Sequence, residues 1–126
     1  MSMAPLSEKP VAQSEIARAE ATLGAARAFM YDTVDDLWQT VVCQQEPSMR
    51  QRALLRAACN HATETAASVA RTASTLAGSA SVYSSSSLQR HARDAEVITH
   101  HFTQSPHVWE DAGRVLLGLQ PQAFLF

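Results

Sequence analysis

The chain has 126 residues, which is enough for one domain with a buried core. Apolar residues make up 46% but aromatic residues only 6%, because alanine, the strongest helix former, supplies much of the apolar share. The formal charge of -2 excludes the strong positive field that attracts nucleic acid or anionic membranes, so we expect neither partner. No signal sequence or long apolar run is present, and this predicts a cytoplasmic protein.

Residues 1–10 contain two prolines and no periodic pattern, so we expect a disordered leader there. A helical bundle domain is predicted over 11–121 and an apolar tail over 122–126. The first helix is expected over 11–45, because apolar residues recur in it every seven positions. The expected inward residues are Ile16, Leu23, Met30 and Leu37, with Ala19, Ala26, Val34 and Val41 beside them and Trp38 at the edge.

A second long helix is predicted after Pro47. Ser48 followed by Gln51 is a capping box, in which each side chain satisfies a backbone amide of the first turn. Small residues occupy both sides of this helix, which suits a central position or an oligomer contact. Gly78 is expected to end it. The two cysteines, Cys43 and Cys59, fall within helical patterns and are expected to be small buried apolar residues.

The segment from Gly78 to Ser87 is rich in serine, but the apolar pair Val82 and Tyr83 favours an ordered loop. Ser86 and Gln89 form a second capping box, so a third helix is predicted from Ser86. A fourth is predicted over 106–117, after Ser105 and Pro106. The expected inward residues are Leu88, Ala92, Ala95, Ile98 or Thr99 and Phe102 in the third helix, and Trp109, Ala112, Val115, Leu116 and Leu119 in the fourth.

The polar residues leave few kinds of chemistry open. Two His-x-x-Glu pairs, at 61–64 and 107–110, do not match the Glu-x-x-His pattern of di-iron bundles, so we expect no metal site. The chain has no Gly-x-Ser-x-Gly motif and no phosphate-binding glycine loop. Arg90, Arg93 and Asp94 allow two interpretations. They form either an ion pair within one helix or part of an anion or cofactor site.

Several motifs together resemble the acyl-CoA dehydrogenase superfamily. They are Leu-Ala-Gly at 76–78 followed by Val-Tyr at 82–83, Leu-Gln-Arg-x-x-Arg-Asp at 88–94, His-His-Phe at 100–102 and Gly-Arg-Val-Leu-Leu-Gly at 113–118. The resemblance extends from about Ser14 to Pro121. It is closest to the C-terminal helical domain of the flavin-dependent monooxygenase branch.

This resemblance implies an all-α, antiparallel up-and-down helical bundle and a flavin, either FAD or reduced flavin. It implies that Gly78 and Ser79 contact the cofactor, that Arg90 and Arg93 lie on the helix beside it, and that His101 gives or takes a proton in catalysis. The family has an N-terminal helical domain and a β-domain that are not found in this sequence. The chain alone is therefore expected neither to form a complete enzyme nor to bind flavin.

The resemblance also predicts the partners. We expect a homo-oligomer, held through the small-residue faces of the second helix and the apolar tail, together with the missing flavin-binding domains or a flavin reductase. One alternative stays open: a stand-alone helical interaction module that has lost flavin binding.

Overall fold

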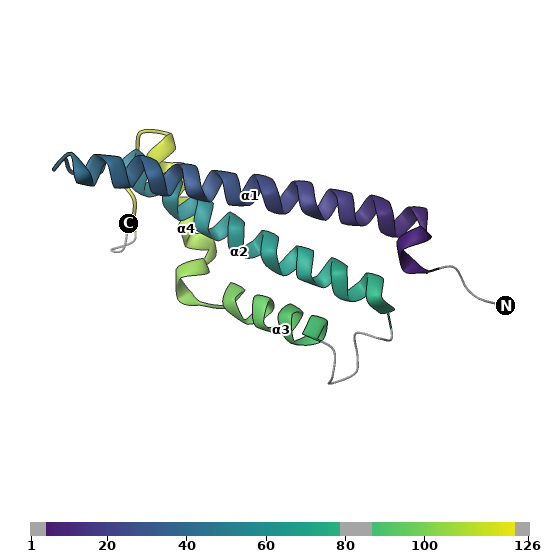
Figure 1. Ribbon diagram of the computed structural model, residues 1–126. Coiled ribbons are helices and arrows are strands. Elements are labelled where there is room, and N and C mark those ends of the chain that lie inside the picture. The colour runs from purple at the N-terminus through teal and green to yellow at the C-terminus, as the bar shows by residue number, and fades with distance from the viewer. Residues whose placement is uncertain (1–4, 79–86, 123–126) are drawn as a thin grey trace.

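The computed structural model describes residues 5–78 and 87–122, and in this part of the chain all regular secondary structure is helical. The fold is therefore all-α, as predicted. Within these described ranges, four α-helices and two short 3-10 turns follow one another (Figure 1). The elements are η1 (Leu6–Glu8), α1 (Pro10–Val42), α2 (Met49–Ala77), α3 (Ser87–Thr99), η3 (Phe102–Gln104) and α4 (Pro106–Leu116).

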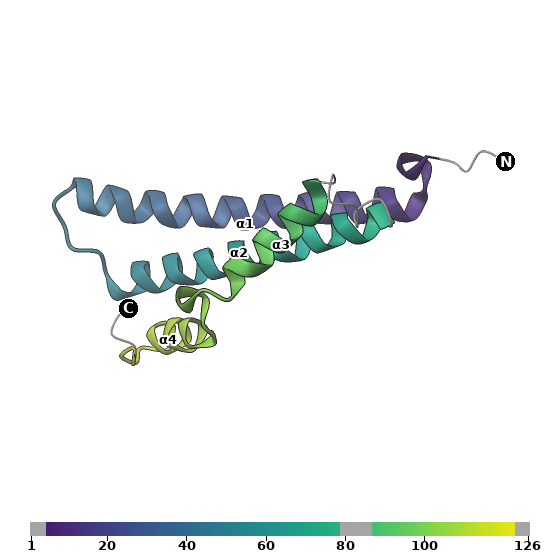
Figure 2. The same ribbon diagram turned by 90° about the horizontal axis from the view of Figure 1, so that it is seen from below.

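α1 and α2 form a long antiparallel hairpin, and α2 is the central helix of the fold. One side of α2 contacts α1, and α3 and α4 contact it as well. Figure 1 shows α1 and α3 on opposite sides of α2, and Figure 2 shows α4 on the side of α2 away from α1. The small residues along α2 allow these three neighbours to approach closely, so the predicted central position is confirmed.

α1 ends at Val42, three residues before the predicted end. Gln44 takes a positive φ of 57°, which terminates a helix and is normally a position for glycine. The Gln45 amide donates to the Thr40 carbonyl (3.1 Å) and the Gln44 amide to the Val41 carbonyl (2.9 Å). These two bonds are the Schellman pattern of helix ends. Cys43 stands at this terminus and is exposed, whereas Cys59 is half-buried, so the expected burial of Cys43 was wrong.

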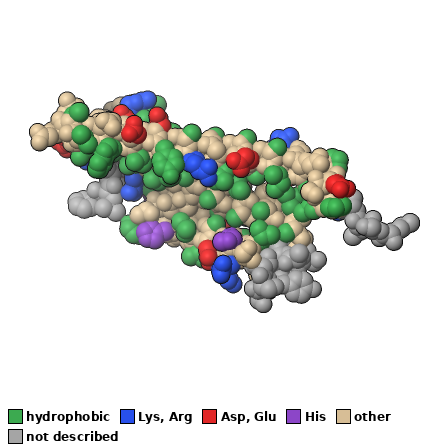
Figure 3. Space-filling model, viewed as in Figure 1, with side chains coloured by type: hydrophobic (Ala, Val, Ile, Leu, Met, Phe, Trp, Pro, Cys, Tyr) green, Lys and Arg blue, Asp and Glu red, His purple; other side chains and the backbone are tan. Residues whose placement is uncertain are grey.

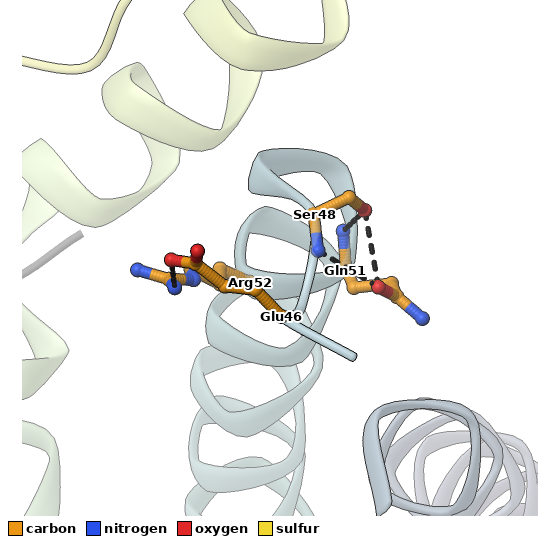
Figure 4. A network of polar contacts seen from close by, with 4 residues as sticks. All are labelled: Glu46, Ser48, Gln51 and Arg52. Carbon is orange, nitrogen blue, oxygen red and sulfur yellow. Dashed lines mark hydrogen bonds and ion pairs between the residues drawn. The ribbon is translucent and has the colours of Figure 1, made fainter. Parts of the chain in front are cut away.

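The predicted capping box at the start of α2 is confirmed. The Gln51 amide donates to Ser48 Oγ (3.2 Å), and the Ser48 amide donates to Gln51 Oε1 (2.9 Å) (Figure 4). Gln51 also donates from Nε2 to Thr40 Oγ1 at 2.7 Å and to Asp36 Oδ2 at 3.1 Å. The cap of α2 is therefore fixed to the last turns of α1.

The residues that are buried on α1 have smaller side chains than predicted. Its fully buried residues are Ala12, Ala26 and Thr33, which share one heptad register. The larger residues Ile16, Val34 and Val41 are more than two-fifths exposed, and so is Trp38. The expectation that Ile16, Val34 and Val41 face inward was therefore wrong. Alanine and threonine let the two long helices approach closely, and this moves the large residues to the flank of α1.

The inward faces of α3 and α4 also differ from the prediction. No described residue of α3 is fully buried, and Ile98 and Phe102 are exposed. In α4 the buried residues are Val108, Asp111 and Ala112, and the core cluster here contains Ala53, Ala57 and Ala112 with Val115 against it. Trp109, Leu116 and Leu119 lie at the surface instead of inside. Trp109 sits at the rim because its indole N–H donates to Glu64 Oε1 on α2 (3.0 Å).

α3 begins at Ser87, one residue after the predicted start, and α4 spans Pro106–Leu116, one residue less than the predicted range of 106–117. α4 begins at Pro106, but the Ser105 side chain makes no capping hydrogen bond. The predicted cap of α3, Ser86, lies outside the described residues, as do Val82 and Tyr83 of the serine-rich loop and the tail residues 123–126. Within the predicted leader, the structure describes the η1 turn, whose Ser7 carbonyl accepts a bond from Gln13 Nε2 (2.9 Å). The 11–121 domain limits stay a prediction.

Candidate functional site

The predicted site residues lie along α3 and at its two ends. Gly78 ends α2, where the chain leaves toward the start of α3 (Figure 1). Its φ of 61° and ψ of -137° form a backbone geometry that residues with a Cβ rarely adopt, which explains the glycine. Gly78 is exposed, and its amide donates to the Thr75 carbonyl. Ser79, the second predicted contact, lies outside the described residues.

Arg90 and Arg93 are exposed on α3, and so is Asp94. Within residues 87–122, Arg90 and Asp94 form no ion pair, so the interpretation as a helix-internal pair is not realised. The ion pair that fixes α3 uses Glu96, whose carboxylate lies 2.7 Å from Arg71 of α2. The two guanidinium groups on α3 are therefore available to an anion.

His101 follows α3 and caps the η3 turn. Its Nδ1 accepts the Thr103 amide at 3.3 Å and lies 2.8 Å from Thr103 Oγ1. Because Nδ1 accepts, the proton of the neutral ring sits on Nε2. The imidazole is exposed, and its centroid lies 4.6 Å from that of Phe102. The contacts of Nδ1 with Thr103 thus leave the Nε2–H group of this exposed ring without a partner among the described residues.

The structure aligns these residues but does not bring them into contact. Gly78 precedes α3 in the chain and His101 follows its last turn, and the 13 residues of α3 make a helix of about 20 Å. The arginines lie between them. This arrangement is an edge that an extended ligand could follow, with phosphate-binding groups toward one end and a histidine at the other.

Sequence reasoning missed an apolar pocket near Gly78. It has a volume of about 500 Å³ and lies between the first turns of α1, the last turns of α2 and the first turn of α3. Ile16, Leu76 and Leu88 line it, and the sequence pattern had assigned Ile16 and Leu88 to the interior. The signal was therefore present, but the pattern could not show that the helices diverge here.

A second missed feature is the buried carboxylate Asp111. It is 3% exposed, and its Oδ1 accepts the Gln122 amide at 2.7 Å, which holds the segment after α4 against the bundle. In the chain the residue stands two positions after Trp109, inside a pattern otherwise typical of an amphipathic helix. Its local sequence context gave no indication of burial.

No metal or membrane feature is found in the described ranges. Residues 5–78 and 87–122 contain no group of three or more His, Cys, Asp or Glu side chains placed to hold a metal ion. His107 Nδ1 lies 3.1 Å from Glu110, and both groups are exposed. None of the described helices has the length and apolar character needed to span a membrane.

Comparisons with known proteins identify the family of the chain. The family described as "Acyl-CoA dehydrogenase, C-terminal domain" matches residues 1–106. An indole-3-acetate monooxygenase of Pseudomonas putida is 37% identical over 92% of the chain, and one of Acinetobacter baumannii is 33% identical over the same share. The chain spans 30% of the length of each of these relatives.

A solved structure has the same fold. The crystal structure of 3-HSA hydroxylase from Rhodococcus sp. RHA1 superposes with a TM-score of 0.89 at 24% sequence identity, covering 96% of this chain and 32% of that one. The chain therefore belongs to the acyl-CoA dehydrogenase family and corresponds to its C-terminal helical domain. Its similarity to two monooxygenases places it in a flavoprotein context, as the resemblance of the motifs implied.

Proposed function

We propose that the chain serves as the C-terminal bundle domain of a flavin-dependent monooxygenase. The observation that carries the proposal is the sequence similarity over 92% of the chain to two enzymes named indole-3-acetate monooxygenase. In the complete protein, the remaining domains would enclose the flavin, and this chain would supply one edge of its site and contacts between subunits. An aromatic compound of the indole type is the proposed substrate class. The proposed location is the cytoplasm.

The residues on α3 are chemically suited to a flavin nucleotide. Arg90 and Arg93 carry exposed guanidinium groups that can bind a phosphate, and Gly78 gives an exposed backbone turn without a side chain. We assign cofactor contacts to these three residues and to Ser79. When bound, reduced flavin supplies the oxygen activation that hydroxylation needs.

His101 is the proposed catalytic residue of this chain. With Nδ1 held by Thr103, the Nε2–H group of the neutral ring can donate a hydrogen bond to an oxygen atom of the substrate or cofactor, and the protonated ring can transfer a proton to that oxygen and later recover it. The contact between Phe102 and the imidazole restricts the ring further. The role of Thr103 is therefore to position His101.

The proposed partners follow from the fact that the chain spans only 30% of the length of its relatives. We propose a homo-oligomer, and a polypeptide that provides the flavin-binding domains or reduces the flavin. The alternative function, a helical interaction module without flavin, is favoured by one observation: the candidate residues lie on an exposed edge, and no other described element encloses them.

A domain exchange tests the proposal. The corresponding 30% of the Pseudomonas putida relative is replaced by this chain, and the purified chimera is examined for bound flavin and for indole-3-acetate hydroxylation. We expect flavin binding and activity. We also expect His101→Ala to reduce kcat with flavin still bound, and Arg90→Ala with Arg93→Ala to weaken flavin binding.

The control is Arg50→Ala, which removes an exposed arginine from the first turn of α2, away from the α3 edge. A chimera that folds, as judged by circular dichroism, but binds no flavin would contradict the proposal and favour the interaction module.

A further inference from the structure

Thr103 offers two groups to Nδ1 of His101, and the two differ in the hydrogen bonds that they can form. The Thr103 amide lies 3.3 Å from Nδ1 and can only donate, whereas the hydroxyl oxygen lies 2.8 Å from the same nitrogen and can donate or accept. Thr103 is half-buried, while the imidazole is exposed. Figure 3 shows histidine side chains at the surface of the edge formed by α3 and η3. The described chain therefore engages one nitrogen of the ring only.

Proton transfer by His101 changes which nitrogen carries a hydrogen. In the neutral ring, Nδ1 accepts the Thr103 amide and the hydrogen is on Nε2. The protonated ring carries a hydrogen on both nitrogens. When its Nε2–H group gives a proton to an oxygen atom, the electron pair of that bond stays on Nε2, and the remaining hydrogen is on Nδ1. Nδ1 is therefore a donor in the protonated ring and directly after the transfer.

We propose that the Thr103 hydroxyl lets His101 pass between these states, because it can change from donor to acceptor when Nδ1 gains a hydrogen. The inference rests on the proposed catalytic role of His101 and goes beyond holding the neutral ring in place. The Thr103 amide cannot take this part, since an N–H group has no lone pair for an Nδ1–H donor. Thr103 acts through His101 and is a positioning residue.

The charged groups around His101 leave Nδ1 to Thr103. None of the ion pairs within residues 5–78 and 87–122 includes His101. The charged residues that join α2 to α3 and α4, or lie in the first turn of α4, have partners of their own: Glu64 with Trp109, Arg71 with Glu96, and His107 with Glu110. His100, the neighbour in the chain, is exposed. The hydroxyl is therefore the acceptor that the described chain offers to an Nδ1–H group.

Thr103→Val tests the hydroxyl alone, because valine keeps the shape of threonine and leaves the backbone amide in place. NMR of the labelled 126-residue chain at one mildly acidic pH gives the ratio of protonated to neutral His101 rings. We expect this ratio to fall about threefold or more, because a hydrogen bond to the charged ring is lost. Thr103→Ala should have the same effect, and Thr103→Ser should keep the original ratio. His107 is the internal control, and its ratio should not change.

The domain-exchange chimera tests whether the same hydroxyl serves catalysis. Thr103→Val should lower kcat about tenfold or more with flavin still bound and KM within about twofold, because the protonated ring and not substrate binding is affected. Thr103→Ser should restore kcat to within about threefold of the original. Thr99→Val is the matched control. It also removes a hydroxyl, one that donates to the Glu96 carbonyl (2.6 Å) and not to His101, so kcat should not change.

Two results would overturn the inference. One is an unchanged ratio of protonated to neutral His101 rings in Thr103→Val and Thr103→Ala that circular dichroism shows to be folded. The other is an equal fall of the ratio in Thr103→Val and Thr103→Ser, which would show that the shape of threonine is needed and not its hydroxyl. The NMR comparison requires neither flavin nor activity. An inactive chimera therefore counts against the proposed function, and the ring itself decides the role of Thr103.

Discussion

Asn60 occupies the middle of α2 with only 1% of its surface exposed, and neither atom of its side-chain amide has a hydrogen-bond partner in the described protein. A buried polar group without a partner costs about 1–3 kcal/mol. We predict that Asn60→Ala raises the free energy of unfolding by about 1 kcal/mol, because alanine removes the amide and is the better helix former. Urea unfolding followed by circular dichroism measures the change.

Asn60→Asp provides the matched control for this position. It keeps the size of the side chain but introduces a buried charge, so it should lower the stability clearly. If Asn60→Ala were less stable than the unaltered chain with an unchanged m-value, the amide would have to be making a stabilising interaction, and the argument would fail.

The tautomer of His101 gives a second prediction for a single residue. Because Nδ1 accepts the Thr103 amide, the neutral imidazole should carry its proton on Nε2. The nitrogen chemical shifts of the ring, measured by NMR in the labelled protein at a pH where the ring is neutral, report the tautomer directly. His107 is the internal comparison, since its Nδ1 lies beside the Glu110 carboxylate and is expected to donate. Nδ1 protonation at His101 would show that the cap of η3 is not formed in solution.

At the scale of the helices, one substitution at the C-terminal end of α1 should stabilise the fold. Gln44 has a positive φ of 57°, a conformation that costs about 1 kcal/mol for a residue with a Cβ. We predict that Gln44→Gly raises the free energy of unfolding by about 0.5–1 kcal/mol. The neighbouring Gln45→Gly is the control, because Gln45 has no positive φ and gains nothing from glycine. Equal effects of the two variants in thermal unfolding would contradict this explanation.

Helix positions could be predicted because their signals are local. Ser48 with Gln51, Gly78 and Pro106 each determine the backbone of one or two turns, and each stands where the structure needs it. The end of α1 was misplaced because Gln44 carries out a role for which glycine is the usual signal. Val34 and Val41 of α1 were misassigned because an apolar heptad pattern does not show which side of the helix packs against the rest of the chain.

In the candidate site, too, one part could be predicted from the sequence and another part could not. The motifs singled out Gly78, Arg90, Arg93 and His101, and the fold adds that all four are exposed, with the two arginines on α3 and the other two beyond its ends. Contacts between elements, such as Arg71 with Glu96 or Trp109 with Glu64, join residues 25 and 45 positions apart in the chain. No local pattern predicts such pairs, since each depends on how the helices are rotated against α2.

At the scale of the whole molecule, the residues proposed to bind flavin are exposed, and no element within residues 5–78 and 87–122 encloses them. Gly78, Arg90, Arg93 and His101 are all exposed, although α3 packs against α2. Charge-assisted hydrogen bonds contribute about 1.5–3 kcal/mol each, and less on an exposed surface, whereas micromolar affinity requires about 8 kcal/mol. The 126-residue chain should therefore bind FAD more weakly than micromolar in a calorimetric titration.

The same experiment separates the two ways in which this prediction could fail. Sub-micromolar binding that Arg90→Ala and Arg93→Ala together remove would show that a second copy completes the site on the α3 edge. Sub-micromolar binding that these substitutions leave unchanged would place the flavin elsewhere, and the apolar pocket beside Leu76 and Leu88 is the next position to examine. Ala73→Trp would fill that pocket, and it should leave the α3 edge intact because Ala73 lies on α2 among the pocket residues. A loss of binding in this variant alone would assign the ring of the flavin to the pocket rather than to the side of His101.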